Sequence, residues 1–239
     1  VTKIYCIALI RIVYVILYPE ISNVVPLGFV FKLLAALSIL FGSFFAITQE
    51  DIKRMLAYSS VSQIGYIVLG FSLFTVSGLK GALLHVINYA FMKITLFLAV
   101  GNIIRNTGKR DIRNLKGIGK KMPVTLISFS IAALSMIGIP PLNGFFSKWY
   151  LAIGSLESGQ LTLLLVIIVS SLLNTFYYLP IIVKAFFEAP TSDLAGVTEV
   201  KPNFYLPVLI LGLGCLLLGL GVQWPMTIIS KAVSSLLIK

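Results

Sequence analysis

Three polar side chains recur at regular spacing inside the otherwise apolar stretch 78–104. His85, Tyr89 and Lys93 are each four residues apart, so on a helix they lie roughly on one face. An ionisable side chain at membrane depth is costly unless it faces protein or water. Imidazole, phenol and amine groups all exchange hydrogen-bonded protons. The spacing therefore predicts a stripe that lines a hydrated path for protons.

A second lysine, Lys148, lies just beyond a predicted break in a helix. Proline removes an N–H donor and clashes with the preceding turn, so a helix through residues 123–152 must unwind or kink within 138–144. Unwound backbone at membrane depth is tolerated only where protein or water satisfies it, as in transporters with broken helices. The alternative is that Lys148 only extends to the membrane interface. The residues that predict the break are Gly138, Pro140, Pro141 and Gly144.

Lysine suits proton transfer because burial disfavours its charged form, whereas arginine keeps its proton. Each polar residue also has a plainer interpretation. Lys93 can be a structural hydrogen bonder between helices, and His85 a satisfied core histidine. The stripe Tyr58–Gln63 is expected to pack helices, and the loop charges Asp51, Lys53 and Arg54 are expected to fix helix ends. Asn174 either hydrates a channel or bonds a neighbouring helix.

Composition places these residues in a membrane protein. The 239 residues are 58% hydrophobic and 11% charged, against about 25% charged in soluble domains. Because the basic residues lie in short loops, the net charge of +11 indicates membrane topology rather than nucleic-acid binding. The sequence carries no metal-ligand cluster, dinucleotide fingerprint or P-loop, so we expect no catalytic residue, cofactor or metal. Cys6 and Cys215 are expected to be core residues.

The apolar runs predict an all-α, polytopic bundle of about seven transmembrane helices in one membrane domain, residues 1–239. A tail at 226–239 is expected to lie at the interface or pack on neighbouring helices. The seven segments are 1–18, 27–48, 56–76, 78–104, 123–152, 160–187 and 204–223.

Lysine and arginine counts predict the orientation. Loops 49–55 and 105–122 together carry nine of the 19 basic residues and fall on one side if seven spans alternate. The positive-inside rule places both loops in the cytoplasm and the C-terminus outside.

Three motifs resemble the antiporter-like membrane subunits of respiratory complex I, membrane-bound hydrogenases and Mrp-type cation/proton antiporters. They are TQEDIKRMLAYSSVSQIGY (48–66), LLHVINYAFMKITLFLAVGNII (83–104) and MIGIPPLNGFFSKWYL (136–151). The resemblance covers essentially the whole chain, in the family's order and spacing. It implies an integral protein of a prokaryotic cell membrane.

The resemblance also implies that the chain is one half of the family fold. Family members usually have fourteen helices in two inverted repeats, and VTKIYCIALIRIVY (1–14) resembles the middle of their eighth helix. We therefore expect this chain to correspond to helices eight to fourteen of the family. It does not begin with Met, so we expect it to come from within a longer protein. The short ending looks most like the D subunit of Mrp antiporters and its hydrogenase relatives.

Functional residues carry over from the resemblance by position. Lys3 matches the lysine of helix eight, His85 and Lys93 match the histidine and lysine of helix eleven, and Lys148 matches the lysine of the broken helix twelve. Tyr89 departs from the pattern, since many members have a second histidine there. The family's glutamate on helix five and lysine on helix seven belong to the other half.

These features favour a proton-translocating membrane subunit of an ion-pumping complex, either an Mrp-type antiporter or a redox-driven relative. The chain is an enzyme only as part of a translocating NADH:quinone oxidoreductase or hydrogenase. The alternatives are a non-conducting structural half-subunit and a secondary cation transporter acting alone. Expected partners are homologous antiporter-like subunits, small membrane subunits, lipid and, in the redox-driven case, a peripheral redox arm. With almost no intramembrane carboxylate, any sodium path is expected in a partner.

Overall fold

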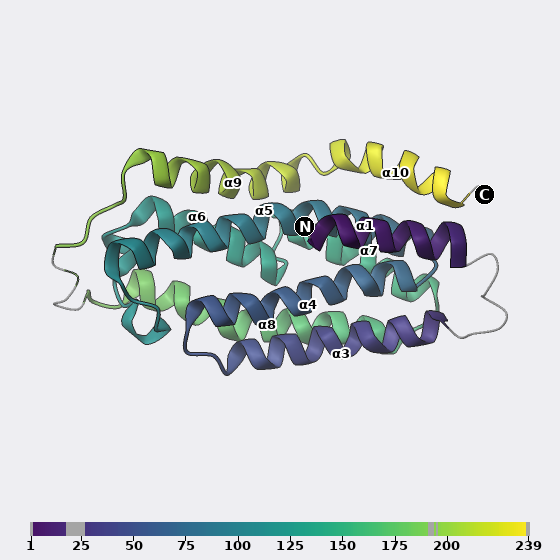
Figure 1. Ribbon diagram of the computed structural model, residues 1–239, viewed down its shortest axis with the longest axis horizontal. Coiled ribbons are helices and arrows are strands. Elements are labelled where there is room, and N and C mark those ends of the chain that lie inside the picture. The colour runs from purple at the N-terminus through teal and green to yellow at the C-terminus, as the bar shows by residue number, and fades with distance from the viewer. Residues whose placement is uncertain (1, 18–26, 191–193, 195, 238–239) are drawn as a thin grey trace.

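The computed structural model describes residues 2–17, 27–190, 194 and 196–237. Within these ranges the regular structure is helical, and the predicted link 19–26 lies outside them. The helices are α1 (Thr2–Arg11), the π-helical η1 (Ile12–Leu17), α3 (Leu27–Ile47), α4 (Ile52–Ser72), α5 (Val76–Thr107), α6 (Pro123–Ile137), α7 (Asn143–Glu157), α8 (Leu161–Phe187), α9 (Pro202–Leu220) and α10 (Gln223–Leu237), with short 3-10 turns at Ile112–Asn114 and Ile118–Lys120 (Figure 1).

The predicted all-α, polytopic membrane bundle is confirmed. Among the described residues, α3, α5, α8 and α9 are each long and apolar enough to cross a membrane. The helices α6 and α7 have 15 residues each. At 1.5 Å per residue each spans about 22 Å, so neither alone crosses a hydrocarbon core of about 30 Å.

The predicted break in the fifth segment is confirmed as well. Helix α6 ends at Ile137 and α7 begins at Asn143. Gly138 ends α6 with a φ of 96°, a left-handed conformation that glycine adopts without the Cβ penalty. The connecting turn contains Pro140 and Pro141.

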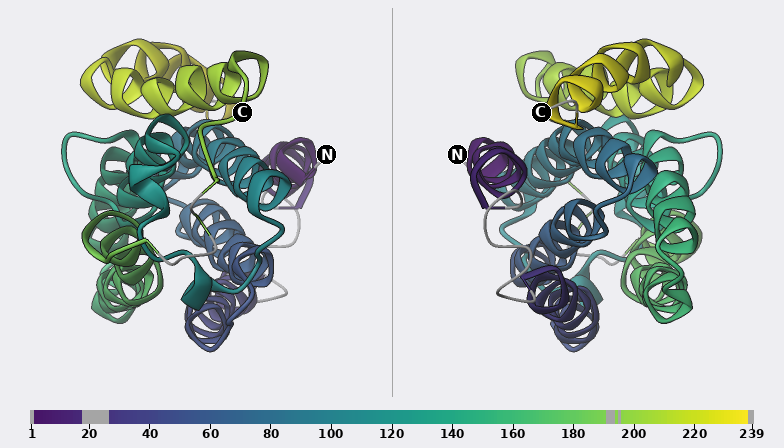
Figure 2. Two further views of the ribbon diagram at one scale, coloured as in Figure 1. Left: turned by 90° about the vertical axis from the view of Figure 1, so that its left-hand side faces the viewer. Right: turned by 90° about the vertical axis from the view of Figure 1, so that its right-hand side faces the viewer.

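Helix α5 lies at the centre of the bundle. It packs against α4, α6, α7, α9 and α10, and the end-on views in Figure 2 show α9 and α10 on one side of the bundle and α3 and α8 on the opposite side. Its ends follow standard capping chemistry: the Thr75 hydroxyl accepts a hydrogen bond from Gly78 N at 3.1 Å, and Gly108 has a φ of 69°. These caps satisfy backbone groups that a helix leaves unpaired.

Small residues bring α5 and α7 into backbone contact. A Cβ on Gly154 would lie 2.5 Å from the backbone nitrogen of Gly78, and a Cβ on Gly81 would lie 2.9 Å from the nitrogen of Leu151. The two pairs show an antiparallel register, in which one step forward on α5 is one step back on α7. Two turns of α5 after Gly78, this register places residue 85 opposite residue 147.

The two charged loops meet at one end of the bundle. The Ile52 N–H donates to the Arg110 carbonyl at 3.0 Å, and the Ile112 N–H donates to the Glu50 carbonyl at 2.9 Å. Asp51 caps α4 by accepting from the backbone N–H groups that follow it, at 2.8 and 3.0 Å. Loops 49–55 and 105–122 therefore lie on the same side, as an alternating series of spans requires.

Helices α9 and α10 follow one another along one side of the bundle (Figure 1). The chain passes between them at Gly221. Helix α10 packs against α5 and η1 and leaves the side chains of Trp224 and Ile228 exposed. It therefore presents an apolar outer face.

Candidate functional site

The stripe His85, Tyr89 and Lys93 lies on the buried side of α5. The three side chains are 0%, 4% and 5% exposed. Because a buried polar group must find hydrogen-bond partners inside the protein or in water, the helices packed on this side determine what each group can do.

Lys93 is held by α4. Its Nζ donates to the Leu56 carbonyl and, at 2.8 Å, to the Ser59 hydroxyl. The ring of Phe97 lies 5.0 Å away, at a distance that allows a cation–π contact. The Ser59 hydroxyl also accepts from Tyr178 Oη at 3.2 Å. Lys93 is therefore joined to α4 directly and to α8 through one serine.

His85 joins α5 to α4 and α7. Its Nδ1 lies 2.9 Å from Ser147 Oγ, and its Nε2 lies 3.0 Å from Gln63 Oε1. The Ser147 hydroxyl also lies 3.0 Å from the Gly144 carbonyl oxygen, so this one hydroxyl contacts both the imidazole and the backbone of α7. The ring of Tyr66 lies 5.5 Å from the imidazole. His85 is thus fixed on both nitrogens by groups from two other helices.

Lys3 reaches the same stripe from α1. Its Nζ lies 4.7 Å from the ring centroid of Tyr89. The Tyr89 ring is in turn parallel to the His85 imidazole, with 2° between the planes and 6.4 Å between centroids. The structure therefore places Lys3, Tyr89 and His85 in sequence along one line of side chains.

The broken span supplies the acceptors for Lys148. Its Nζ donates to the carbonyl oxygens of Met136 at 2.9 Å and Ile137 at 3.0 Å, and to Ser171 Oγ at 3.1 Å. These carbonyls are in the last turn of α6, where a helix leaves its C=O groups unpaired. The Tyr66 ring lies 4.9 Å below the ammonium. The break therefore creates the site that binds Lys148.

The start of α7 is fixed by a serine of α6. The Ser135 hydroxyl donates to Asn143 Oδ1 and accepts from Gly144 N at 2.9 Å. A Cβ on Gly144 would overlap the Ser135 carbonyl oxygen, so only glycine allows this approach. These contacts hold the two half-helices in one fixed arrangement.

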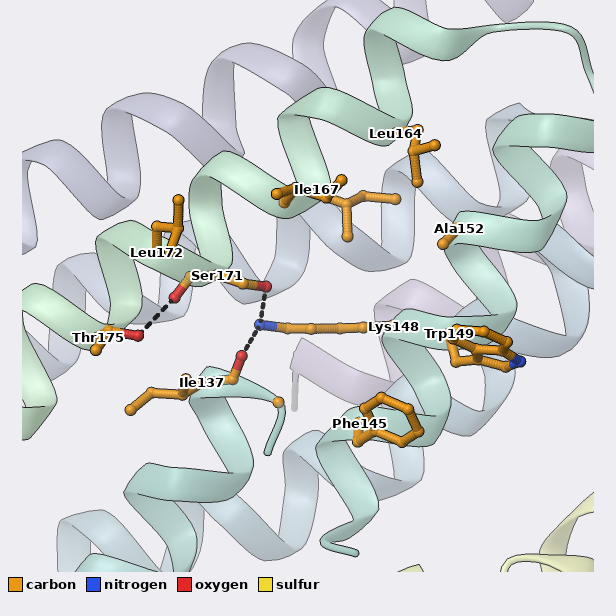
Figure 3. Close-up of a pocket in the computed structure, with 12 residues that line it drawn as sticks. Ile137, Phe145, Lys148, Trp149, Ala152, Leu164, Ile167, Ser171, Leu172 and Thr175 are labelled. Atoms are coloured by element: carbon orange, nitrogen blue, oxygen red, sulfur yellow. Dashed lines mark hydrogen bonds between the residues drawn. The ribbon is translucent and has the colours of Figure 1, made fainter. Parts of the chain in front are cut away.

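A cavity of about 430 Å³ opens beside Lys148, between α7 and α8. Its lining is mainly apolar, with Phe145 and Trp149 on one side (Figure 3). Polar groups line the other side, where Ser171 lies next to the lysine and the Thr175 hydroxyl donates to the Ser171 carbonyl (Figure 3). The lysine is only 6% exposed, so the cavity approaches Lys148 without uncovering it.

Four buried polar atoms in the described ranges lack a protein hydrogen-bond partner, and two of them belong to side chains beside His85. They are Gln63 Nε2, Tyr66 Oη, Asn88 Oδ1 and Asn143 Nδ2. Gln63 and Tyr66 contact the imidazole directly, and Asn88 Nδ2 binds the Asn143 carbonyl at 2.7 Å. Buried polar groups of this kind are bound by ordered water in most proteins. Water is therefore the expected neighbour of this part of the stripe.

The sequence identified the lysines, the histidine and the break but not their partners. Ser147 and Ser171 were missed because serine is common in membrane helices and has no distinctive spacing here, and Ser59 was included only in the stripe Tyr58–Gln63 expected to pack helices. For Gln63 a signal exists: Ser59, Ser62, Gln63 and Tyr66 lie on one face of α4 at helical spacing. Across the described part of the chain, no three His, Cys, Asp or Glu side chains come together as metal ligands would.

The fold and site together define a polytopic helical membrane protein with basic side chains buried beside a broken span. More particularly, the chain belongs to the NADH:quinone oxidoreductase/Mrp antiporter transmembrane family, whose model matches residues 1–174.

Two relatives illustrate the similarity in sequence. The chain is 43% identical over 231 residues to NADH-quinone oxidoreductase subunit N of Desulforudis audaxviator, covering 92% of this chain and 46% of that protein. It is 31% identical over 219 residues to F(420)H(2) dehydrogenase subunit N of Methanosarcina mazei, covering 88% and 44%. The chain thus spans about half the length of the curated relatives it matches.

Solved structures show the same fold. A chain of the Mrp complex from Dietzia sp. DQ12-45-1b matches with a TM-score of 0.90 and 27% identity, over 99% of this chain and 51% of that one. A chain of an archaeal membrane-bound sulfane sulfur reductase matches with a TM-score of 0.88 and 28% identity, over 97% and 46%. A chain of respiratory complex I from Thermus thermophilus matches at 0.81 and 25%, over 95% and 49%.

Proposed function

We propose that this chain is part of a proton-translocating membrane subunit of a multi-subunit ion-pumping complex. The observation that carries the proposal is the chemistry around Lys93 and Lys148. Both lysines are buried, and their hydrogen-bond acceptors are uncharged carbonyl and hydroxyl oxygens. The ion pairs among the described residues involve Arg113 and Lys116 but neither of these two lysines.

A buried ammonium without a carboxylate partner is expensive, by several kcal/mol after relaxation. Releasing its proton removes that cost, and a neutral amine still donates to two acceptors and accepts from a hydroxyl. Ser171 beside Lys148 and Ser59 beside Lys93 are hydroxyls that fit both states. The lysines are therefore suited to alternate between protonated and neutral forms, which a proton carrier requires.

The proposed pathway follows the stripe. Lys3 lies against Tyr89, the Tyr89 ring faces His85, and His85 binds Ser147, which precedes Lys148 in the chain. Tyr89 does not titrate near neutral pH, but its hydroxyl relays protons through hydrogen bonds. Ordered water at the unpartnered atoms around His85 completes the connection.

We place the driving force outside this chain, in electron transfer by partner subunits. This assignment is supported by the names of the relatives described above, which are subunits N of NADH-quinone oxidoreductase and F(420)H(2) dehydrogenase. The structural similarity to an Mrp complex supports the second candidate, a subunit driven by or driving cation exchange. In both cases homologous antiporter-like subunits and small membrane subunits are the expected partners.

We further propose that residues 1–239 form one membrane domain, the C-terminal half of a fourteen-helix subunit, with 226–239 packed along it. The relatives of about twice the length support this arrangement. Loops 49–55 and 105–122 are assigned to the cytoplasm because their basic residues lie at one end of the bundle, which the positive-inside rule assigns to that side.

The test replaces Lys93 and Lys148 singly by alanine in the full-length subunit of the assembled complex. Proton uptake into membrane vesicles is followed with a pH-sensitive dye, and assembly is checked by native gel electrophoresis. We expect each variant to assemble and to lose at least about tenfold in transport, the range that positioned proton-transfer groups contribute. Lys120→Ala, on the exposed loop surface, is the matched control and keeps full transport.

Two results would replace the proposal. Full transport in both lysine variants would make the chain a non-conducting structural half-subunit. Cation exchange by the purified full-length subunit alone, in liposomes without its partners, would make it a secondary transporter.

A further inference from the structure

A cluster of three buried hydroxyl groups joins α3, α4 and α8 away from the stripe. Ser43 Oγ lies 2.9 Å from Ser62 Oγ and 3.1 Å from Ser170 Oγ, and all three residues are 0% exposed. We call Ser43, Ser62 and Ser170 the hydroxyl cluster. It adjoins neither His85 nor Tyr89 through any hydrogen bond described above, so the pathway proposed so far does not use it.

One end of the hydroxyl cluster leads to Lys148. Ser171, the residue after Ser170, accepts from Lys148 Nζ at 3.1 Å. The fully buried Tyr66 hydroxyl faces the hydroxyls of Ser170 and Ser171 but makes no hydrogen bond of normal geometry. A small rotation or one water molecule therefore completes a line of hydroxyl groups from Lys148 to Ser170.

Asn174 links the hydroxyl cluster to the broken span near Lys148. Its Oδ1 accepts from Tyr177 Oη at 2.7 Å and lies 3.5 Å from Ser43 Oγ. Its Nδ2 donates at 3.1 Å to the Met136 carbonyl, the same oxygen that binds Lys148. The hydroxyl cluster and the lysine are thus held to one carbonyl of the broken span.

The other end leads towards Lys93. Ser62 lies one helical turn from Ser59 on α4, and Ser59 Oγ accepts from Lys93 Nζ at 2.8 Å. Side chains three residues apart on a helix have Cβ atoms about 5–6 Å apart, a gap that one bridging water spans. The polar groups therefore run from one buried lysine to the other through α3, α4 and α8.

Close packing fixes the hydroxyl cluster in place. A Cβ on Gly42 would lie 2.6 Å from the backbone nitrogen of Ser62, so α3 and α4 meet at backbone distance beside Ser43. Small polar residues at such contacts commonly hold membrane helices together, so helix packing is the alternative role of the hydroxyl cluster. A chain of hydroxyls can do more, because each oxygen accepts a proton on a lone pair while releasing its own and ends unchanged.

We propose that the hydroxyl cluster forms a second proton connection between Lys93 and Lys148, parallel to the one through His85. The inference rests on the proposed function. The connection through His85 starts at Lys3 and uses Tyr89, Gln63 and Ser147, so the two connections meet at Lys148 and share no other residue.

The test compares Ser43→Ala, His85→Asn and the double variant in the assembled complex, using proton uptake into vesicles per assembled complex. Ser38→Ala, half-buried on the same helix, is the control. For parallel connections each single variant keeps the share carried by the other connection, about half, and the double variant falls well below the product of the two fractions, a coupling that independent sites do not show. Ser62→Ala repeats the cycle at the next hydroxyl if Ser43→Ala fails to assemble.

Two outcomes overturn the inference and are distinct from failure of the proposed function. If the double variant equals His85→Asn alone, the hydroxyl cluster only packs helices. If Ser43→Ala alone abolishes transport and His85→Asn adds nothing, the two groups lie in series. Lys148→Ala is measured alongside: transport that survives it refutes the proposed function itself.

Discussion

The Nζ of Lys148 lies 2.9 Å from the carbonyl oxygen of Met136, so a side chain of α7 binds the end of α6 across the break. The same lysine binds the next carbonyl, that of Ile137, at 3.0 Å. In an unbroken helix these carbonyls would accept from backbone N–H groups four residues on. The Lys148 ammonium group therefore replaces backbone donors that the break removes. The same group is the proposed proton carrier, so one side chain serves both the fold and the proposed transport.

Replacing Lys148 by methionine is expected to destabilise the protein as well as stop transport. The variant leaves the Ile137 carbonyl without its donor, while the Met136 carbonyl keeps only Asn174 Nδ2, and an unsatisfied buried acceptor costs about 1–3 kcal/mol. The measurement is the thermal unfolding midpoint of the full-length subunit in detergent. Lys148→Arg separates the two effects, since arginine keeps donors but not a releasable proton: it should retain more stability and still lose transport. An unchanged midpoint in Lys148→Met would contradict this account of the break.

Gly144→Ala is expected to disrupt the start of α7. Its Cβ would overlap the Ser135 carbonyl oxygen, and overpacking of a close contact typically costs about 1–3 kcal/mol. Gly101→Ala is the matched control, because a Cβ on Gly101 in α5 meets nothing within 4 Å and alanine favours a helix interior by about 1 kcal/mol. Unfolding midpoints of the two full-length variants should move in opposite directions. Equal shifts would show that the contact between Ser135 and Gly144 is not tight in solution.

The sequence predicted the parts of the site that local chemistry determines. The fourfold spacing of His85, Tyr89 and Lys93 places them on one face because helix geometry alone decides it. The prolines at 140 and 141 predict the break for the same kind of reason. Both features depend on residues close together in the chain.

The partners of these groups depend on contacts between distant segments, which spacing cannot supply. Ser147 meets His85 because Gly78 and Gly154 set the register of α5 against α7. Ser171 meets Lys148 because α8 returns along the break. A serine that relays or binds looks, in sequence, like a serine that only packs helices.

Ser147→Ala is expected to impair transport through its effect on His85. The variant removes the hydroxyl that hydrogen-bonds His85 Nδ1 at 2.9 Å, and a buried polar group without a partner costs about 1–3 kcal/mol. The imidazole is then free to turn, so proton uptake into vesicles should fall while the complex still assembles. Ser155→Ala is the control: this serine is equally buried on α7 but bonds to its own helix, at the Leu151 carbonyl. Equal transport in the two variants would show that Ser147 does not position the histidine.

The contact between the two charged loops should weaken in acid. The side chain of Arg113 donates to the Asp111 carboxylate, at 2.8 Å for the shortest bond, and together with the Arg113 backbone N–H it lowers the pKa of Asp111 below its ordinary value of 3.8. A carboxyl group whose pKa is depressed by folding contributes stability above its unfolded pKa and loses it as the pH falls through the folded value. Below pH 3.8, the amides of Ile52 and Ile112, which bond across the loops, should therefore lose protection against hydrogen exchange relative to their intrinsic rates. Mass-spectrometric exchange on the full-length protein measures this, and Asp111→Asn should remove the dependence because the amide does not titrate. Protection that falls equally in Asp111→Asn would assign the acid sensitivity to another group.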